Sequence, residues 1–366
     1  MIDYSFYRRI GDEGIKKLYA GHPDDVFETV DSAMSDLPYV DQMETTNRCN
    51  IKCVMCPRGQ ENHMTRAVMN MARPLFQKII DQIDDIEEEK KGRGISEADF
   101  RADPPQDLVW EGSVDDICNL RLHHFGSPIL DPEIVDRVTY VKSNTGIGVH
   151  FSETASNLRT KKVKQLFDAG LDRLTIALDG TNAEEFYRVR GIKIDFDKVL
   201  RTVQEIIRLK IVSTYETRLY VQLIQMKDAP KAKFIEEWEK EPEIGIIHKP
   251  FFPYPDVSHD FVTSPDNVFN KKCKIPFTSV TVLADGRVVP CNSDYNGEHI
   301  LGDLNTESLE KVWNGETFRD FRRDFVYRTF ESGSLCNRCG YYPFGNYKNH
   351  VGLPLIKSTY EKGNSR

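Results

Sequence analysis

Three cysteines in one short stretch constrain this chain more than any other feature of its sequence. They are Cys49, Cys53 and Cys56, and neither a histidine nor a further cysteine follows within the next six residues. A structural zinc site closes its coordination shell with four protein ligands. Three thiolates without a local fourth therefore predict a metal centre with one open position. Closely spaced thiolates bind zinc, copper(I) or iron–sulfur clusters, so a zinc knuckle remains an alternative at this point.

The composition is that of a soluble globular protein with room for one large and one smaller domain. The chain has 366 residues, of which 39% are hydrophobic and 29% charged. A net charge of −8 argues against nucleic acid or an anionic membrane as a partner. No apolar run reaches the roughly 18 residues of a membrane span, and the first residues lack the apolar core of a secretory signal. We therefore expect a cytoplasmic protein.

The cysteines fall into three groups along the chain. In a reducing compartment, eight cysteines indicate metal chemistry rather than disulfides. Four thiolates complete a coordination shell, so the late group could hold structural zinc or a fully ligated [4Fe–4S] cluster. The hairpin predicted around Ala284-Asp285-Gly286 would bring its first two members together. Besides the first three, the groups are Cys118 alone and the late Cys273, Cys291, Cys336 and Cys339.

Strand and helix patterns alternate along the first two thirds of the chain. Alternation of this kind predicts a parallel sheet with right-handed crossovers, here a partial (β/α)6 TIM-like barrel of the α/β class. The first cysteines follow the first predicted strand, at the end of the strands where such barrels carry their active sites. The predicted strands are 39–46, 117–125, 147–152, 173–178, 215–226 and 244–247. The predicted helices are 73–86, 133–141, 160–169, 183–188, 196–209 and 232–239.

The pattern changes near residue 255, where we place a domain boundary. A small C-terminal α+β domain is predicted there, with strands at 277–283 and 287–290 and one helix at 306–325. The N-terminal extension contains a helical pattern at 24–34 and is expected to pack on the outside of the barrel. A charged insertion is predicted either as a surface loop or as a substrate lid. The predicted divisions are 1–38, 39–255 with the insertion 87–116, 256–348, and a tail at 349–366.

Two patterns resemble a known family. Cys-x3-Cys-x2-Cys, with Asn50 after the first cysteine and Pro57-Arg58 after the third, resembles the radical S-adenosylmethionine (SAM) enzymes. Cys-x12-Gly-x4-Cys, then Leu301-Gly302-Asp303-Leu304, Trp313 and Cys-x2-Cys, resembles their C-terminal SPASM or Twitch extension. Tyr341, Tyr342 and Phe344 stand where the fuller SPASM version has further cysteines, so the shorter Twitch version is expected.

The resemblance implies a set of cofactors and contacts. The first three cysteines would hold a [4Fe–4S] cluster whose free iron binds SAM, and the four late cysteines would hold one auxiliary [4Fe–4S] cluster. Ser127 stands where the family has a glutamate, and Ala177 where it has a serine, which puts two SAM contacts in doubt. A flavodoxin or ferredoxin would supply electrons. The expected cofactor contacts are Met55, Gly126, Ser127, Ser152, Thr154, Ser156, Asn157, Arg190 and Gln225.

The reaction expected from this resemblance is oxidation of a small-molecule alcohol. The late cysteine spacing is similar to that of Twitch dehydrogenases of aminoglycoside biosynthesis, which implies a carbohydrate or aminocyclitol substrate and electron transfer to the auxiliary cluster. The acidic chain would suit an aminated, cationic substrate. His124 and His248 are candidates for the group that handles the hydroxyl proton. The alternatives are epimerisation, with Cys118 as hydrogen-atom donor, and modification of a ribosomal peptide.

Overall fold

The computed structural model describes residues 26–93, 119–226, 228–241, 243–250, 254–257, 275–327, 329–339 and 355–357. Its strands are β1 Val40–Met43, β2 Asn119–Arg121, β3 Gly148–Thr154, β4 Arg173–Ala177, β5 Arg218–Gln225, β6 Ile244–Pro250, β7 Val280–Val282, β8 Arg287–Val289, β9 Gly302–Asp303 and β10 Leu355–Lys357. Its α-helices are α2 Val26–Ala33, α3 Arg73–Gly92, α5 Ile134–Asn144, α6 Thr160–Asp168, α7 Ala183–Arg190, α8 Phe196–Val212, α9 Lys231–Trp238, α11 Leu309–Asn314, α12 Glu316–Tyr327 and α13 Leu335–Arg338.

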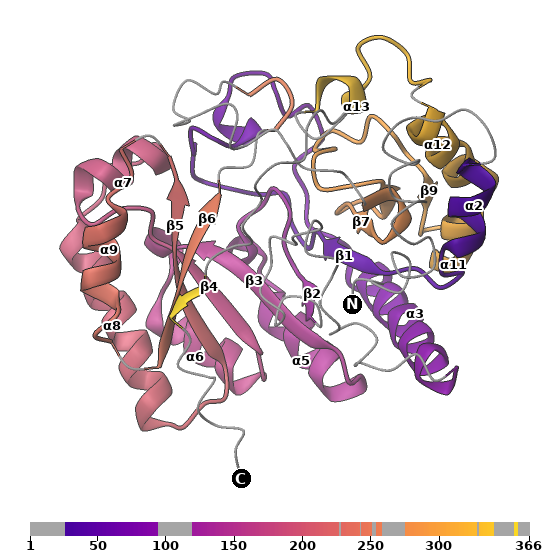
Figure 1. Ribbon diagram of the computed structural model, residues 1–366. Coiled ribbons are helices and arrows are strands. Elements are labelled where there is room, and N and C mark those ends of the chain that lie inside the picture. Colours follow the sequence, from indigo (N-terminus) through magenta and orange to yellow (C-terminus); the bar gives the residue numbers. More distant parts are fainter. Residues whose placement is uncertain are drawn as a thin grey trace.

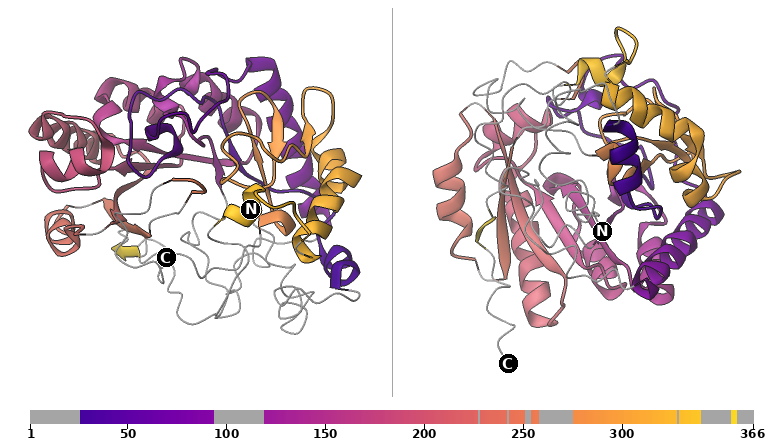
Figure 2. Two further views of the ribbon diagram at one scale, coloured as in Figure 1. Left: turned by 90° about the horizontal axis from the view of Figure 1, so that it is seen from above. Right: turned by 45° about the vertical axis from the view of Figure 1, so that its right-hand side comes forward.

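The strands form one ten-stranded sheet in the order β10-β6-β5-β4-β3-β2-β1-β7-β8-β9. Strands β1 to β6 run parallel in chain order, as expected for βα units joined by right-handed crossovers. Figure 1 shows this sheet with α3, α5, α6, α8 and α9 along its outer side, and the two views of Figure 2 show its curvature. The predicted partial TIM-like barrel is confirmed.

The two faces of the curved sheet differ in chemistry. Leu174 and Ile176 of β4 belong to the large apolar core that the outer helices cover. The alternate positions point inward and are polar: the guanidinium carbon of Arg173 lies 4.4 Å from the centre of the Tyr220 ring. Burial, and then the nearby Arg121, His123 and Arg218, hold the pKa of His150 well below its ordinary value. The inner wall of the barrel is thus polar and crowded with cationic groups.

Local sequence explains where two of the outer helices begin and end. Asn182 caps α7 by accepting hydrogen bonds from the backbone N–H groups of Glu184 and Glu185. Asp195 caps α8 in the same way through the N–H of Lys198. Gly191 ends α7 with a φ of 67°, a left-handed conformation that glycine adopts without steric cost. The end of α7 at this glycine brings Arg190 beside the first cysteine loop.

The C-terminal strands continue the barrel sheet rather than forming a separate one. Strand β7 pairs in parallel with β1, and β8 and β9 add antiparallel strands outside it. The predicted hairpin around Gly286 is present, with that glycine at a φ of 91°. At the opposite edge, β10 pairs antiparallel with β6. The sheet therefore joins the segment with the first cysteines directly to the segment with the late ones.

Two predictions about helices differ from the structure. Helix α3 extends to Gly92, so residues 87–92 are not part of a surface loop; Lys90 is buried and donates from Nζ to the Pro38 carbonyl at 3.0 Å. Residues 94–116 of the predicted insertion lie outside the described residues. The single helix expected at 306–325 is two, because Gly315 adopts an extended conformation between α11 and α12.

The N-terminal helix α2 lies on the C-terminal region and not on the outside of the barrel. Arg319 Nε of α12 bonds Asp31 Oδ2 at 2.9 Å, and Trp313 Nε1 donates to the carbonyl of Ser35 at 2.8 Å. Figures 1 and 2 show α2 beside α12. Amphipathic periodicity does not predict which surface α2 covers, because an amphipathic helix can cover any apolar surface of matching size.

Candidate active site

The first cysteine loop is compact and lies directly after β1. Cys53 is buried against Ile51, Met55, Val189 and Met226. The N–H of Cys56 donates to the Cys53 carbonyl at 3.1 Å, which closes a turn between the second and third cysteines. A side chain at position 59 could not be accommodated, since a Cβ there would lie 2.1 Å from the Cys53 oxygen. The loop thus holds its three thiols in one apolar pocket.

The electrostatics of the three thiols fit a bound cationic centre. Burial raises the pKa of Cys49, and it raises that of Cys56 to about 12; the charge of Cys53 adds to both shifts. Three thiolates this close therefore require positive charge between them. Among the described residues, no three His, Cys, Asp or Glu side chains are placed to hold a single metal ion.

Arg190 approaches the cysteine loop from the end of α7. Its Nη1 lies 3.4 Å from Cys53 Sγ, and its Nη2 pairs with the buried carboxylate of Asp179. Its Nε is buried and has no hydrogen-bond partner among the described residues. Gly191 brings the arginine this close, because a Cβ there would lie 2.3 Å from the Lys52 carbonyl oxygen. An acceptor such as a carboxylate would satisfy the unpaired N–H.

A polar cluster lies on the other side of the loop. Gly126 is pressed against the backbone before the cysteines, where a Cβ would lie 1.9 Å from the Thr46 oxygen. Ser127 Oγ donates to Glu153 Oε2 at 2.7 Å, and Asn157 Nδ2 donates to Ser127 Oγ at 3.0 Å. Asn157 also exchanges amide hydrogen bonds with Asn50, at 3.1 and 3.0 Å. Loops after β2 and β3 thus meet beside Cys49.

The other expected cofactor contacts take different places. Ser156 Oγ is buried without a hydrogen-bond partner among the described residues, so its hydroxyl is available to donate a hydrogen bond to a ligand or to accept one from it. Thr154 ends β3, where its N–H donates to Glu153 Oε1, and the Ser152 N–H donates to His123 Nδ1 at 3.4 Å. Met55 packs within the cysteine loop. Gln225 is the last residue of β5.

Three of the late cysteines lie in the described part of the C-terminal region. Cys291 follows β8, and its Sγ accepts from the N–H of Ser293 at 3.4 Å. Cys336 lies in α13 and Cys339 caps that helix, with its N–H donating to the Cys336 carbonyl at 3.3 Å. Cys273 and Cys118 lie outside the described residues. The role of Cys118 as a hydrogen-atom donor stays a prediction.

Two regions of the chain, the segment with the first cysteines (residues 49–66) and the segment with the late ones (residues 291–339), are in direct contact; we call them the two cysteine regions. Arg66 Nε donates to the Tyr295 carbonyl at 2.7 Å, and Asn296 bonds the backbone of Thr65 and His63 at 2.9 and 2.7 Å. Arg338, which lies between the last two cysteines, pairs with Asp256 at 3.1 Å. The segment after the first cysteines therefore packs on the segment after Cys291.

A buried carboxylate strengthens this contact. Glu44 is fully buried and accepts from both Nη atoms of Arg66, at 2.7 and 2.8 Å. Its oxygens also face the N–H groups of Ala284 and Phe125 at 3.1 and 3.4 Å. His124 Nδ1 lies 3.6 Å away, while its Nε2 donates to the Asn292 carbonyl at 3.0 Å. His124 thus links the loop after β2 to the segment after β8. This position gives the residue, which was predicted to accept the hydroxyl proton, a structural role.

His248 does not lie with this group. His248 lies on β6, where it pairs in register with Leu223 of β5. It shares the face of Ile244 and Ile246, which is the helix-covered face. Burial, and then the charge of Lys231 on α9, lower its pKa to about 4. The period of two in a strand places it on the side opposite the barrel interior, so its location does not favour the expected catalytic role.

Sequence reasoning missed an aromatic wall between the two cysteine regions. The Phe125 ring lies 5.1 Å from that of Tyr254 and 5.6 Å from that of Tyr295, centre to centre. The Phe125 carbonyl accepts from Arg58 Nε at 3.1 Å, two residues after the third cysteine. Burial raises the pKa of Tyr254, and the charges of Cys56 and Cys291 add to this effect. The phenol therefore lies within electrostatic range of both regions.

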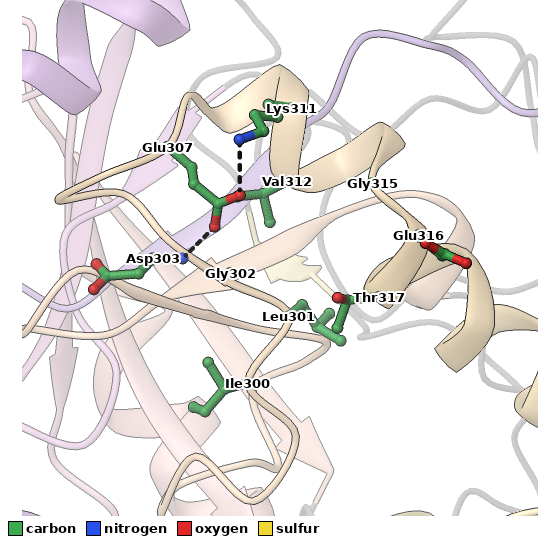
Figure 3. Close-up of a pocket in the computed structure, with 10 residues that line it drawn as sticks. All are labelled: Ile300, Leu301, Gly302, Asp303, Glu307, Lys311, Val312, Gly315, Glu316 and Thr317. Carbon is green, nitrogen blue, oxygen red and sulfur yellow. Dashed lines mark hydrogen bonds and ion pairs between the residues drawn. The ribbon is translucent and has the colours of Figure 1, made fainter.

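A surface pocket of about 380 Å³ is separate from both cysteine regions. It lies between the segment of β9 and helices α11 and α12, and Figure 3 shows its lining, which contains no cysteine. Glu307 accepts there from the Asp303 N–H and faces Lys311. Because no cysteine lines this pocket, we do not assign it to the chemistry of the cysteines.

Fold and site together define the class of the protein. Residues 43–221 match the radical SAM superfamily, and residues 273–340 match SPASM, an iron–sulfur cluster-binding domain. The chain is a radical SAM enzyme with a C-terminal SPASM-type domain. Its cofactors are a [4Fe–4S] cluster that binds SAM and an auxiliary iron–sulfur cluster. The three apolar thiols, the unpaired Nε of Arg190 and the unpaired hydroxyl of Ser156 fit the first of these.

Among known proteins, the chain is similar to S-adenosyl-L-methionine-dependent 2-deoxy-scyllo-inosamine dehydrogenase of Niallia circulans. The two are 26% identical over 70 residues, which cover 19% of this chain and only 28% of that enzyme. Its fold is similar to that of BtrN in complex with AdoMet and 2-DOIA, with a TM-score of 0.50, 14% identity and 86% and 97% of the two chains covered. SuiB of Streptococcus suis gives a TM-score of 0.55 at 11% identity, covering 88% and 78%.

One further comparison agrees on the fold. Native anSMEcpe with bound AdoMet has a TM-score of 0.52 at 11% identity, covering 86% of this chain and 92% of the other. Within the described residues, we find no helix with the length and apolarity that a membrane crossing needs. At identities this low, the solved structures speak to the fold alone.

Proposed function

We propose that this radical SAM enzyme oxidises an alcohol carbon of a small aminated carbohydrate or aminocyclitol to the carbonyl. The observation that carries the proposal is the aromatic wall of Phe125, Tyr254 and Tyr295, which joins the first cysteine loop to the segment after Cys291. A substrate against this wall would lie between the site of hydrogen abstraction and an electron acceptor. The similarity to an inosamine dehydrogenase supports the choice of substrate class.

The proposed reaction removes two hydrogens and balances as follows. When bound, SAM and its cluster supply a 5′-deoxyadenosyl radical that takes a hydrogen atom from carbon, and the auxiliary cluster supplies an acceptor for the remaining electron. The hydroxyl proton leaves to a base or to water, and the carbon–oxygen bond becomes a carbonyl. Reduced flavodoxin or ferredoxin of the cytoplasm would provide the electron that starts each turnover.

The residues of the chain have distinct tasks in this proposal. Arg190 offers its unpaired Nε–H to the carboxylate of SAM, since its other nitrogens are held by Cys53 and Asp179. Ser156 offers a hydroxyl to the same ligand. The aromatic wall excludes water from the radical's path, which prevents the loss of the radical to solvent. Glu44 accepts from the Ala284 N–H and Arg66 donates to the Tyr295 carbonyl, and these bonds keep the two cysteine regions at a fixed separation.

Anaerobic product analysis tests the proposal. The reconstituted protein would be incubated with SAM, a reductant and 2-deoxy-scyllo-inosamine, then with a panel of amino sugars. We expect a ketone and 5′-deoxyadenosine in equal amounts, and transfer of a carbon-bound deuterium from the substrate into 5′-deoxyadenosine. Deuterium from solvent appearing on carbon, without ketone, would show epimerisation instead, and loss of that label in Cys118→Ala would identify the donor.

Two cysteine variants separate the roles of the two centres. Cys53→Ala removes a ligand of the SAM-binding cluster and should abolish both 5′-deoxyadenosine and ketone. Cys291→Ala removes a ligand of the auxiliary cluster and should abolish the ketone while 5′-deoxyadenosine is still formed. Ketone formation at the wild-type rate in Cys291→Ala would contradict the proposed electron acceptor.

A further inference from the structure

Glu153 is a buried carboxylate beside the first cysteine loop, and the proposed chemistry described above gives it no task. Its side chain is 2% exposed and lies at the end of β3. It accepts hydrogen bonds from Ser127 Oγ at 2.7 Å, the Thr154 N–H at 2.8 Å, the Ile129 N–H at 3.1 Å and Asn157 Nδ2 at 3.2 Å. All four donors are electrically neutral.

A cation to balance this charge is missing from its surroundings. Within the described part of the chain, Glu153 forms no ion pair with lysine, arginine or histidine. Burial raises its pKa, and the four hydrogen bonds only partly oppose that effect. Buried carboxylates are ordinarily paired with a positive charge, because an isolated buried charge loses its hydration without compensation. The site therefore favours a cationic ligand.

The hydrogen bonds around Glu153 are also short of donors. The amide nitrogen of Asn157 carries two hydrogens but faces three acceptors: Asn50 Oδ1 at 3.0 Å, Ser127 Oγ at 3.0 Å and Glu153 Oε1 at 3.2 Å. At any moment, one of these three oxygen acceptors therefore receives no hydrogen bond from Asn157. An ammonium group brings three N–H donors and one positive charge, which would satisfy both deficits.

The cluster of Glu153, Ser127 and Asn157 lies next to the cysteine loop whose iron–sulfur cluster binds SAM, a cationic cofactor. Asn50 directly follows Cys49, and the Ser127 N–H donates to the Arg48 carbonyl at 2.7 Å. Asn157 bonds both Glu153 Oε1, at 3.2 Å, and Asn50 Oδ1, at 3.0 Å, so the carboxylate is one side chain away from the residue after Cys49. SAM carries an ammonium group, and Arg190, the partner suited to its carboxylate, contacts Cys53.

We propose that Glu153, with Ser127 and Asn157, binds the ammonium group of SAM and supplies the negative charge for it. Ser127 itself cannot supply charge, and its hydroxyl is already donated to Glu153. The inference deepens the proposed function and rests on its SAM-binding step, not on which alcohol is oxidised. The carboxylate beside the ammonium group would thus come from the end of β3, and not from the turn after β2, where the family has its glutamate and this chain has Ser127.

The test measures SAM binding to the cluster-loaded protein in the absence of substrate. Titration calorimetry gives the dissociation constant, and electron paramagnetic resonance of the reduced cluster reports SAM at the iron. Glu153→Gln keeps the shape and removes the charge, and we expect SAM to bind about 10- to 100-fold more weakly, as for loss of one charge-assisted hydrogen bond. Glu236→Gln, the same change on the exposed face of α9, should leave the constant unchanged.

A SAM analogue without the amino group identifies the part of the ligand involved. In the wild type the analogue should bind more weakly than SAM, and in Glu153→Gln this difference should shrink. Unchanged SAM affinity in Glu153→Gln, or an equal loss for SAM and the analogue, would overturn the proposal. Neither outcome depends on ketone formation, so failure here is distinct from failure of the proposed oxidation.

A second variant covers the case in which Glu153→Gln does not load its cluster. The double substitution Ser127→Glu with Glu153→Ser exchanges the two residues, so that the carboxylate comes from position 127 and the hydroxyl from position 153. We expect it to restore cluster loading and SAM affinity to within about tenfold of the wild type. A double variant that loads its cluster but does not bind SAM contradicts the proposal, and so does one that loads no cluster.

Discussion

Replacing Glu44 with glutamine should destabilise the protein more than any comparable change at the surface. Glu44 is 0% exposed, and the Arg66 side chain it pairs with is 4% exposed. Glu44→Gln leaves the buried guanidinium without a counter-charge and turns an NH2 group toward donors that now have no acceptor. Removing one partner of a buried ion pair costs about 3–5 kcal/mol, and we expect the free energy of unfolding to fall by that amount.

The effect should also depend on pH in a defined direction. Burial alone would raise the pKa of Glu44, but the neighbouring His124 and Arg66 lower it well below the ordinary 4.5. A carboxyl whose pKa is lower in the folded state stabilises fully above its unfolded pKa and loses that contribution as the pH falls toward the folded value. The stability difference between wild type and Glu44→Gln should therefore be constant above pH 4.5 and shrink below it.

Anaerobic urea denaturation of the cluster-loaded protein measures this difference. The matched control is Glu88→Gln, which removes the same charge from a pair on α3 whose side chains are 63% and 65% exposed, and which should have no measurable effect. Because Glu44 also bonds the backbone of the C-terminal hairpin, ketone formation should fall more than SAM cleavage. A loss equal to that of the control would refute the reasoning.

The remaining predictions concern the cysteine loop and its surroundings. Gly191→Ala should lower iron content per chain, because the new Cβ meets the Lys52 oxygen at 2.3 Å, whereas Gly146→Ala, with open space around it, should not. Arg190→Lys should weaken SAM binding in calorimetry about tenfold, since an ammonium cannot reproduce the guanidinium fork; unchanged binding would exclude the carboxylate contact. His248→Gln should flatten the loss of stability as the pH falls from 6.5 to about 4, because a buried neutral imidazole must then take up a proton. A thermal-unfolding series over that range checks it, and parallel curves for the two proteins would contradict it.

Much of the barrel could be predicted from the sequence because its signals are local. Apolar spacing, the caps at Asn182 and Asp195 and the glycine at 191 each act within a few residues, and the helices and strands they define are present. One error fell where a distant contact decided the outcome: Lys90 is helical and buried, and the Pro38 carbonyl, 52 residues away, accepts a hydrogen bond from its Nζ. Another has a local cause, since Gly315 adopts an extended conformation and two short helices replace one.

The candidate site shows the same division. Cysteine spacing was sufficient to indicate a metal centre, since ligands of one centre that lie in one loop are close in sequence. The aromatic wall as a whole could not be predicted, because Phe125 and Tyr254 are far apart along the chain and only the fold brings their rings together. His248 was assigned to the site because it follows a predicted strand near the domain junction. A strand's period of two fixes which residues share a face, but not which face meets the helices.

By itself, then, the sequence determined that the chain has two cysteine centres and a βα barrel, because thiol spacing and apolar periodicity are properties of short segments. Only the tertiary structure decided how these parts meet. Strand β7 pairs with β1, so that the segment after Cys291 packs on the segment after the first cysteines, and Glu44 bonds Arg66 and the hairpin at Ala284. Glu153 reaches Ser127 across 26 residues, because parallel strands place the loops that follow them at one edge of the sheet.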